Sequence, residues 1–137
     1  MDEALLAEYR ASTYVVCVDE IHWPAIHLDK PLPSILQTLV GDHAWAFITA
    51  WNPGSIRRPD ATNEAAQREL LREFDNHAEA PAILPAIGIG PTGWHEPSLF
   101  VVGPEFVVFD ALGIAHGQNA YLRGRGKSPA CLHVLCP

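Results

Sequence analysis

Apolar residues that recur every four positions predict one amphipathic helix in the middle of the chain. These residues are Ala66, Leu70, Phe74 and Ala78. We expect the helix to run from Asn63, whose side chain can cap the first turn, to about His77. Glu64 and Arg68 lie four residues apart on the other face, which is therefore predicted to be solvated.

Runs of β-branched and aromatic residues predict several strands. Residues 44–51 (AWAFITAW) are apolar apart from Thr49, a run too continuous for a half-exposed strand, which favours a central strand covered on both faces. The other segments that we expect to form strands are residues 13–18, 82–90, 98–102, 118–122 and 130–135. Pro85 interrupts the second of these segments, and a proline inside a strand predicts an edge position or a bend.

Two short helices are predicted nearer the N-terminus. Asp2 can cap a helix that runs to about Tyr9. Residues 34–40 (SILQTLV) follow a proline and precede Gly41, whose left-handed conformation would end a helix. The intervening residues 19–33 contain three prolines and are predicted to form a loop.

Residues 105–112 admit two interpretations. Gly103-Pro104 could turn a hairpin into a further strand. We favour a helix, with Pro104 at its first position and Gly113 beyond its end.

The predicted helices and strands alternate irregularly, without the strand–helix–strand repeat of a parallel sheet. Such an order favours an α+β fold, a layered domain with a mixed β-sheet and about three to four short helices. Because 137 residues is the length of one domain, we assign residues 1–137 to a single domain.

The composition is that of a globular protein, with 48% apolar and 18% charged residues. There are 9 Lys and Arg against 16 Asp and Glu, a net charge of −7, which disfavours general binding to nucleic-acid phosphates. The acidic N-terminus lacks the pattern of a signal peptide, and no apolar run approaches the roughly 20 residues that span a bilayer. With three cysteines and no CxxC pair, we expect a soluble protein of the reducing cytoplasm with no membrane partner.

The sequence contains no motif that predicts a cofactor or a metal centre. GxGxxG, Walker, GxSxG and HExxH motifs are all missing from the sequence. His22 and His27 do not have a helical ligand spacing, and for Cys131 and His133 ordinary packing is favoured over zinc. We therefore expect no cofactor and no bound metal.

Polar and aromatic residues gather where predicted strands begin or end. The three segments are residues 51–55 (WNPGS), residues 94–98 (WHEPS) and residues 117–120 (GQNA). Ligands commonly bind at loops that follow buried strands, so these segments predict a site at one end of the sheet.

The three segments belong to a larger set of short motifs. The others are residues 9–14 (YRASTY), residues 46–50 (AFITA), Asn63 and Leu112-Gly113. The combination resembles DUF3293, a family of uncharacterised bacterial domains, over nearly the whole chain. The resemblance implies a bacterial origin and a shared site, and it implies no activity. His116 departs from the family's pattern, which more often has an aromatic residue before Gly117.

Glu96 is the residue that we expect to carry any proton transfer. It lies between Trp94 and Pro97 in an apolar loop, where partial burial would raise its pKa toward that of a general acid or base. The alternative is a structural carboxylate that accepts backbone N–H bonds and fixes the turn.

Three amide side chains, those of Asn52, Gln118 and Asn119, could orient a substrate, because an amide both donates and accepts hydrogen bonds. Each has a structural alternative. Asn52 precedes a proline and is a good turn former, while Gln118 and Asn119 could hold loop carbonyls.

The loop after the central strand contains two adjacent arginines. Arg57 and Arg58, with the N-terminus of the helix capped by Asn63, could bind an anion; solvated arginines are the alternative. Trp51 is expected to form the floor of a pocket at the strand exit, and Trp45 is expected to lie in the core.

The leading hypothesis is a binding site for a small or nucleotide-like molecule, with or without catalysis by Glu96. Its predicted lining is Trp51, Asn52, Ser55, Arg57, Asn63, Trp94, Glu96, Gln118 and Asn119. One alternative is a noncatalytic interaction module whose motif residues brace loops. A second, which the net charge disfavours, is nucleic-acid binding through Arg57, Arg58, Arg123, Arg125 and Lys127.

Overall fold

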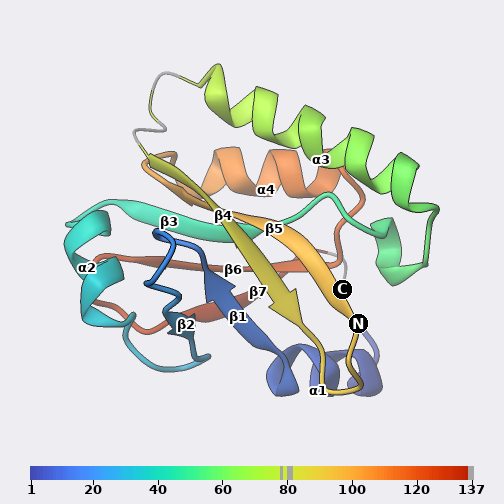
Figure 1. Ribbon diagram of the computed structural model, residues 1–137, viewed down its shortest axis with the longest axis horizontal. Helices are drawn as coiled ribbons and strands as arrows, with labels where there is room; N and C mark the ends of the chain where they lie inside the picture. The colour runs from blue at the N-terminus through green and yellow to red at the C-terminus, as the bar shows by residue number, and fades with distance from the viewer. Residues whose placement is uncertain (78, 80–81, 136–137) are drawn as a thin grey trace.

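Seven strands of the described chain join in one sheet (Figure 1). The computed structural model describes residues 1–77, 79 and 82–135. The order across the sheet is β2-β1-β4-β5-β3-β6-β7. Along the chain the strands are β1 (Thr13–Val16), β2 (Ala25–Ile26), β3 (Ala44–Ile48), β4 (Ala82–Ile89), β5 (His95–Val102), β6 (Ala120–Arg125) and β7 (Cys131–Val134).

The helices are arranged as layers on the two faces of the sheet (Figure 1). They are α1 (Glu3–Ala11), α2 (Ser34–Val40), α3 (Asp60–Asp75) and α4 (Phe106–Ala115), with a short 3₁₀ turn at Pro53–Ser55. Leu70 and Phe74 of α3 pack with Phe109 of α4 in one core, while Leu36 and Val40 of α2 belong to the other. The predicted α+β class and the layered arrangement are therefore confirmed.

The sheet is antiparallel at every described pair of neighbours, where the sequence led us to expect parallel and antiparallel pairs together. A parallel pair requires a crossover between adjacent strands. Here the crossovers through α3 and α4 join strands that are not neighbours, namely β3 to β4 and β5 to β6. Adjacent strands such as β4 and β5 are instead joined by a short turn, which makes the pair antiparallel.

β3 is the central strand that the apolar run predicted, and all five of its residues are buried. Trp45 and Phe47 point into the core on the α2 side, whereas Ala46 and Ile48 point into the core beneath α3 and α4. The strand ends at Ile48, so Trp51 lies in the loop that follows.

The two N-terminal helices lie where they were predicted. Asp2 caps α1, since its Oδ1 accepts a hydrogen bond from Leu5 N at 3.0 Å. α2 spans the predicted residues and is followed by Gly41 with φ +58°. None of the described helices has the length and apolar character needed to cross a membrane.

Two helix boundaries differ from the prediction. α3 begins at Asp60, so Asn63 lies inside its first turn and is not its cap. Ala78, the last position of the predicted apolar repeat, lies outside the described residues. α4 continues through Gly113 to Ala115, so this glycine does not end the helix. A Cβ at Gly113 would lie 2.5 Å from Leu135 Cδ1, and the glycine thus allows Leu135 to pack closely against the helix.

β4 is an interior strand between β1 and β5, so the edge position that Pro85 predicted as one of two possibilities is wrong. The Pro85 carbonyl accepts a hydrogen bond from Cys17 N at 2.8 Å, one residue beyond the end of β1. The N and the carbonyl of one residue face the same neighbour in an antiparallel sheet. The nitrogen of Pro85 therefore faces the point where the β1 ladder ends, and its missing N–H is tolerated.

Two segments that were predicted as turn or loop contain strand residues. β5 starts at His95, three residues earlier than predicted, so Glu96 lies in a strand that pairs with Gly88 of β4. The short β2 lies within the segment predicted as a loop. Its two residues are too few to show the alternation of apolar and polar positions that predicts a strand.

Gly124→Ala is expected to lower the free energy of unfolding by about 1–3 kcal/mol, because overpacking a rigid core forces side chains to move. A Cβ at Gly124 would lie 2.7 Å from Nε1 of the fully buried Trp45. Gly88→Ala is the matched control, since its Cβ would meet only Glu96 O at 3.9 Å. Urea unfolding of both variants measures the difference; equal losses would contradict the prediction.

Candidate functional site

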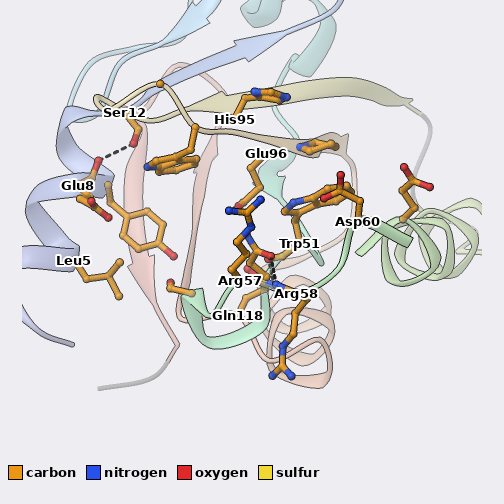
Figure 2. A pocket seen from close by; sticks show the side chains of 17 residues that line it. Leu5, Glu8, Ser12, Trp51, Arg57, Arg58, Asp60, His95, Glu96 and Gln118 are labelled. Atoms are coloured by element: carbon orange, nitrogen blue, oxygen red, sulfur yellow. Dashed lines mark hydrogen bonds between the residues drawn. The ribbon is translucent and has the colours of Figure 1, made fainter. Parts of the chain in front are cut away.

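An open cavity of about 700 Å³ lies where β3 and β5 meet the N-terminal helix (Figure 2). Its walls come from α1, from residues 51–58 after β3, from the start of α3, from the turn before β5 with the first residues of β5, and from Gln118. Glu96 and Trp51 point into the space between α1 and α3 (Figure 2). Segments that are far apart in the sequence therefore meet around one hollow.

Seven of the nine predicted site residues line this cavity, and two lie behind it. The seven are Trp51, Asn52, Ser55, Arg57, Trp94, Glu96 and Gln118. Asn63 and Asn119 do not belong to the described lining, and both contact residues that do.

Asn63 supports the loop after β3 and does not face the cavity. Its side chain is 1% exposed. Its Nδ2 donates to Asn52 Oδ1 at 2.7 Å and its Oδ1 accepts from Asn52 N at 2.9 Å. Asn52 Oδ1 also accepts from Arg58 N at 3.0 Å, and Asn52 itself has φ +45°. The reciprocal amide pair therefore holds a left-handed turn against α3.

Gln118 and Asn119 brace the same loop from the β6 side. Gln118 Nε2 donates to Trp51 O at 3.2 Å, and Asn119 Nδ2 donates to Ser55 Oγ at 3.0 Å. Ser55 has φ +61°, a conformation that is costly for a residue other than glycine. The amide side chains thus have the bracing role weighed as the alternative, and they fix the shape of the cavity wall.

Glu96 is a carboxylic acid in the cavity wall whose pKa is shifted to near neutrality. Its side chain is half-buried, and burial raises its pKa from 4.5 to about 7. The carboxyl group forms no ion pair with any residue in the described part of the chain. At neutral pH it can therefore both donate and accept a proton.

Tyr9 faces the cavity from α1 and was not among the predicted site residues. Burial raises the pKa of its phenol, the nearby Ser55 hydroxyl opposes that shift, and the charge of Glu96 adds to it. The phenol therefore stays protonated near neutral pH and can donate a hydrogen bond. The hydroxyl of Tyr14 donates to the Tyr9 carbonyl and fixes this end of α1 to the sheet.

Three other residues of the α1 wall were also missed, namely Leu5, Glu8 and Ser12. Leu5 and Glu8 lie across the cavity from Trp51 (Figure 2). The motif at residues 9–14 was a sequence signal for this wall, but its spacing does not indicate that it faces the cavity.

Trp94 is held beside the cavity by the backbone of Gly90. Gly90 N donates to Trp94 O at 2.8 Å, and a Cβ on Gly90 would lie 2.0 Å from the indole ring. The indole therefore lies directly against the glycine and remains 40% exposed. An exposed ring in this position can stack on a flat ligand.

The sequence model of the family described as "protein of unknown function (DUF3293)" matches residues 48–121. This chain belongs to the DUF3293 family. The matched segment contains the loop after β3, α3, the turn between β4 and β5, and Gln118, but not α1. No curated protein and no solved structure matches the chain significantly.

Charges of both signs line the cavity of this DUF3293 protein. Arg57 and Arg58 form no ion pair with a described residue, so their guanidinium groups are available to an anion. The predicted anion site at an Asn63 cap needs correction, because α3 starts at Asp60. The Asp60 carboxylate already lies in the first turn, where it opposes a second negative charge.

The remaining arginines proposed for nucleic-acid contact lie in a different environment. Arg123 pairs with Asp110 at 3.3 Å and lies over the Phe106 ring at 4.2 Å. Arg125 pairs with Glu105. These cations have acidic partners on α4 or beside it, unlike Arg57 and Arg58. In the part of the chain that the structure describes, no three His, Cys, Asp or Glu side chains could hold a metal ion.

Glu96→Gln is expected to stabilise the DUF3293 protein at pH 8 by about 1–3 kcal/mol and to change little at pH 4. The folded-state pKa of about 7 exceeds the ordinary 4.5, so the folded chain keeps a proton that the unfolded chain releases. Ionisation of Glu96 therefore lowers stability as pH rises through that window. Urea unfolding at pH 4, 6 and 8 measures the difference in free energy of unfolding between the variant and the wild type.

Glu8→Gln, an exposed carboxylate on the opposite wall, is the control for loss of a charge. A Glu96→Gln variant that is less stable than the wild type at every pH would instead make Glu96 a structural brace.

Asn63→Ala is expected to lower the free energy of unfolding by about 2–3 kcal/mol, because it leaves buried polar groups of the Asn52 turn unpaired. Asn119→Ala removes a single hydrogen bond, the more solvent-exposed one to Ser55, and is expected to lower the free energy of unfolding by less than about 1 kcal/mol. Urea unfolding at pH 7 compares them. Equal stability of the two variants would show that the amide pair is not the principal support of the loop.

Proposed function

We propose that the cavity binds a small, polar or nucleotide-like molecule and that Glu96 exchanges a proton with it. The observation that carries this proposal is the meeting of Glu96 with Trp51, Arg57 and Gln118 around one hollow, from segments separated in the sequence. A carboxyl group with a pKa of about 7 suits general acid–base chemistry, which works best when the pKa lies near the operating pH.

Two amide atoms support the positioning of a ligand. Asn52 Nδ2 and Gln118 Oε1 make no hydrogen bond with a described residue, whereas the other end of each amide is held by the loop. These two residues line the cavity, so the unpaired amide atoms offer a ligand a donor and an acceptor whose side chains are already ordered, with little further loss of side-chain entropy. The protonated phenol of Tyr9 adds a second donor.

The wall also offers groups for an aromatic ring and for an anion. Trp51 and Trp94 present indole surface, and Arg57 and Arg58 have no described acidic partner. Guanidinium groups bind phosphate and carboxylate well. A ring that carries an anionic group is the ligand type that uses both features.

A noncatalytic module remains the second candidate, and the bracing bonds favour it. Asn52, Asn63, Gln118 and Asn119 all hold loop backbone or one another. Those bonds fix the wall whether or not a reaction takes place, so turnover must separate the two candidates. A cytoplasmic setting is part of the proposal, since Cys17 and Cys131 are free thiols in the described structure.

A thermal-shift screen with nucleoside monophosphates, sugar phosphates and small carboxylates tests the proposal, because a specific ligand stabilises the folded state by mass action. At least one compound class should raise the melting temperature of the wild type, and Arg57→Gln should weaken its binding at least fivefold. Arg72→Gln, an exposed arginine of α3 outside the cavity, should leave binding unchanged.

A screen without stabilising compounds, or equal effects of the two arginine variants, would refute the proposed site. Incubation of a bound compound with wild type and with Glu96→Gln then separates the candidates. Turnover that only the wild type shows assigns catalysis to Glu96, whereas binding without turnover in both assigns a noncatalytic module.

A further inference from the structure

α1 forms one wall of the cavity, yet none of its nine residues is buried. Its residues Leu5 and Glu8 lie on one side of the cavity, and Glu96 lies on the other (Figure 2). A helix this short is marginal in water by itself, since isolated helices need roughly 12–15 residues to persist. α1 therefore depends on contacts with the rest of the chain, although it contributes no residue to either core.

The contacts that hold α1 in place include three polar ones. The Tyr14 hydroxyl donates to the Tyr9 carbonyl, which lies in the last turn of the helix. Arg10 Nη1 lies 3.2 Å from Asp29 Oδ2, but both side chains are more than half exposed, so this ion pair contributes little. The Ser55 hydroxyl also interacts with the Tyr9 phenol.

Tyr14 anchors its end of this contact in the core. It is 6% exposed, and its ring packs edge-on against Phe47 of the central strand β3, with 5.3 Å between the ring centroids. The hydroxyl that α1 accepts from is therefore held in a fixed position by the sheet. A helix without buried side chains is thus attached to the sheet by a rigid donor.

Glu96 is protonated near neutral pH because it is buried, and α1 contributes to that burial. Burial is the cause of its raised pKa, and it forms no ion pair with a described residue. Its charge adds to the raised pKa of both Tyr9 and Tyr14, so both phenols lie within electrostatic range of the carboxyl group. The other titratable or charged side chains in the cavity wall are Glu8 of α1, Arg57 and Arg58 of the loop after β3, Asp60 and Glu64 of α3, and His95 of β5.

We propose that Tyr14 is a positioning residue that holds α1 against the cavity, and that release of α1 exposes Glu96 to water. An uncovered carboxyl group loses its proton more readily, because water stabilises the charged form. By linkage, ionisation of Glu96 in turn favours the released helix. α1 thereby controls whether Glu96 carries a proton at neutral pH. Use of that proton in a reaction rests on the proposed function, whereas the coupling of α1 to Glu96 does not.

Tyr14→Phe removes the tether and keeps the ring that packs on Phe47. Amide hydrogen exchange of α1 at pH 6 should accelerate at least fivefold, because the helix opens more often. Carbon-13 NMR of the carboxyl group should show the pKa of Glu96 lowered by at least about 0.5. Tyr121→Phe is the matched control, since it removes the hydrogen bond from a 2% exposed tyrosine to Asp110 and should change neither reading.

Ala7→Gly weakens α1 from outside the cavity and the core. Ala7 is exposed and does not belong to the described cavity lining. Glycine in a helix interior is destabilising, so α1 exchange should accelerate about threefold or more and the pKa of Glu96 should again fall. Ala111→Gly, at an exposed position of α4, is the matched control and should leave both readings unchanged.

Unchanged α1 exchange in either Tyr14→Phe or Ala7→Gly overturns the inference, as does faster exchange with an unchanged pKa of Glu96. A lowered pKa without faster α1 exchange also overturns it, because Tyr14 would then act on the carboxyl group by another route. None of these readings uses a ligand. A cavity that binds no compound therefore leaves the coupling standing, and an uncoupled α1 leaves the proposed binding site standing.

Discussion

The burial of β3 on both faces is the constraint on which the rest of the structure depends. Its five residues contribute to both cores, so the helices of each layer are positioned relative to one strand. The indole nitrogen of Trp45 has no hydrogen-bond partner among the described residues, which is the cost of placing a tryptophan there. Because β3 is held on both sides, the loop that leaves it at Trp51 starts from a fixed point.

The site follows from how that loop is supported. Asn52 and Ser55 both have positive φ, a conformation that is costly for residues other than glycine, and Gly54 between them supplies a third positive φ without that cost. Amide side chains from α3 and from the start of β6 compensate for it. Asn63 and Asn119 therefore brace the loop from outside the cavity, whereas Asn52 and Gln118 belong to the same bracing network and also line the cavity.

Much of the fold could be predicted, since periodicity and turn residues report directly on local structure. The continuous apolar run gave the central strand, and Asp2 and Gly41 marked helix ends by their own backbone chemistry. Antiparallel pairing could not be predicted in the same way, because it depends on which strands become neighbours. The edge position predicted from Pro85 was wrong for a related reason, because a missing N–H matters only where the neighbouring strand continues.

The prediction of the site was strongest for side chains at strand ends and weakest for α1. Loop position and residue type were enough to predict that Glu96 and Trp51 line one hollow. The apolar neighbours of Glu96 predicted its burial, and that burial raises its pKa. Asn63 was correctly predicted to lie at the start of α3 but was assigned the wrong role, because the sequence does not distinguish a helix cap from an amide in the first turn. Nothing in the spacing of Leu5 and Tyr9 indicates which distant segment they face.

α1 differs from the other walls of the cavity in what it contributes to stability. Every residue of α1 is described, and none of them is buried. Changes to its cavity-facing side chains at Leu5 and Glu8 therefore carry little energetic penalty for the sheet. Substitutions in this wall can therefore change the shape and charge of the cavity while the scaffold stays intact.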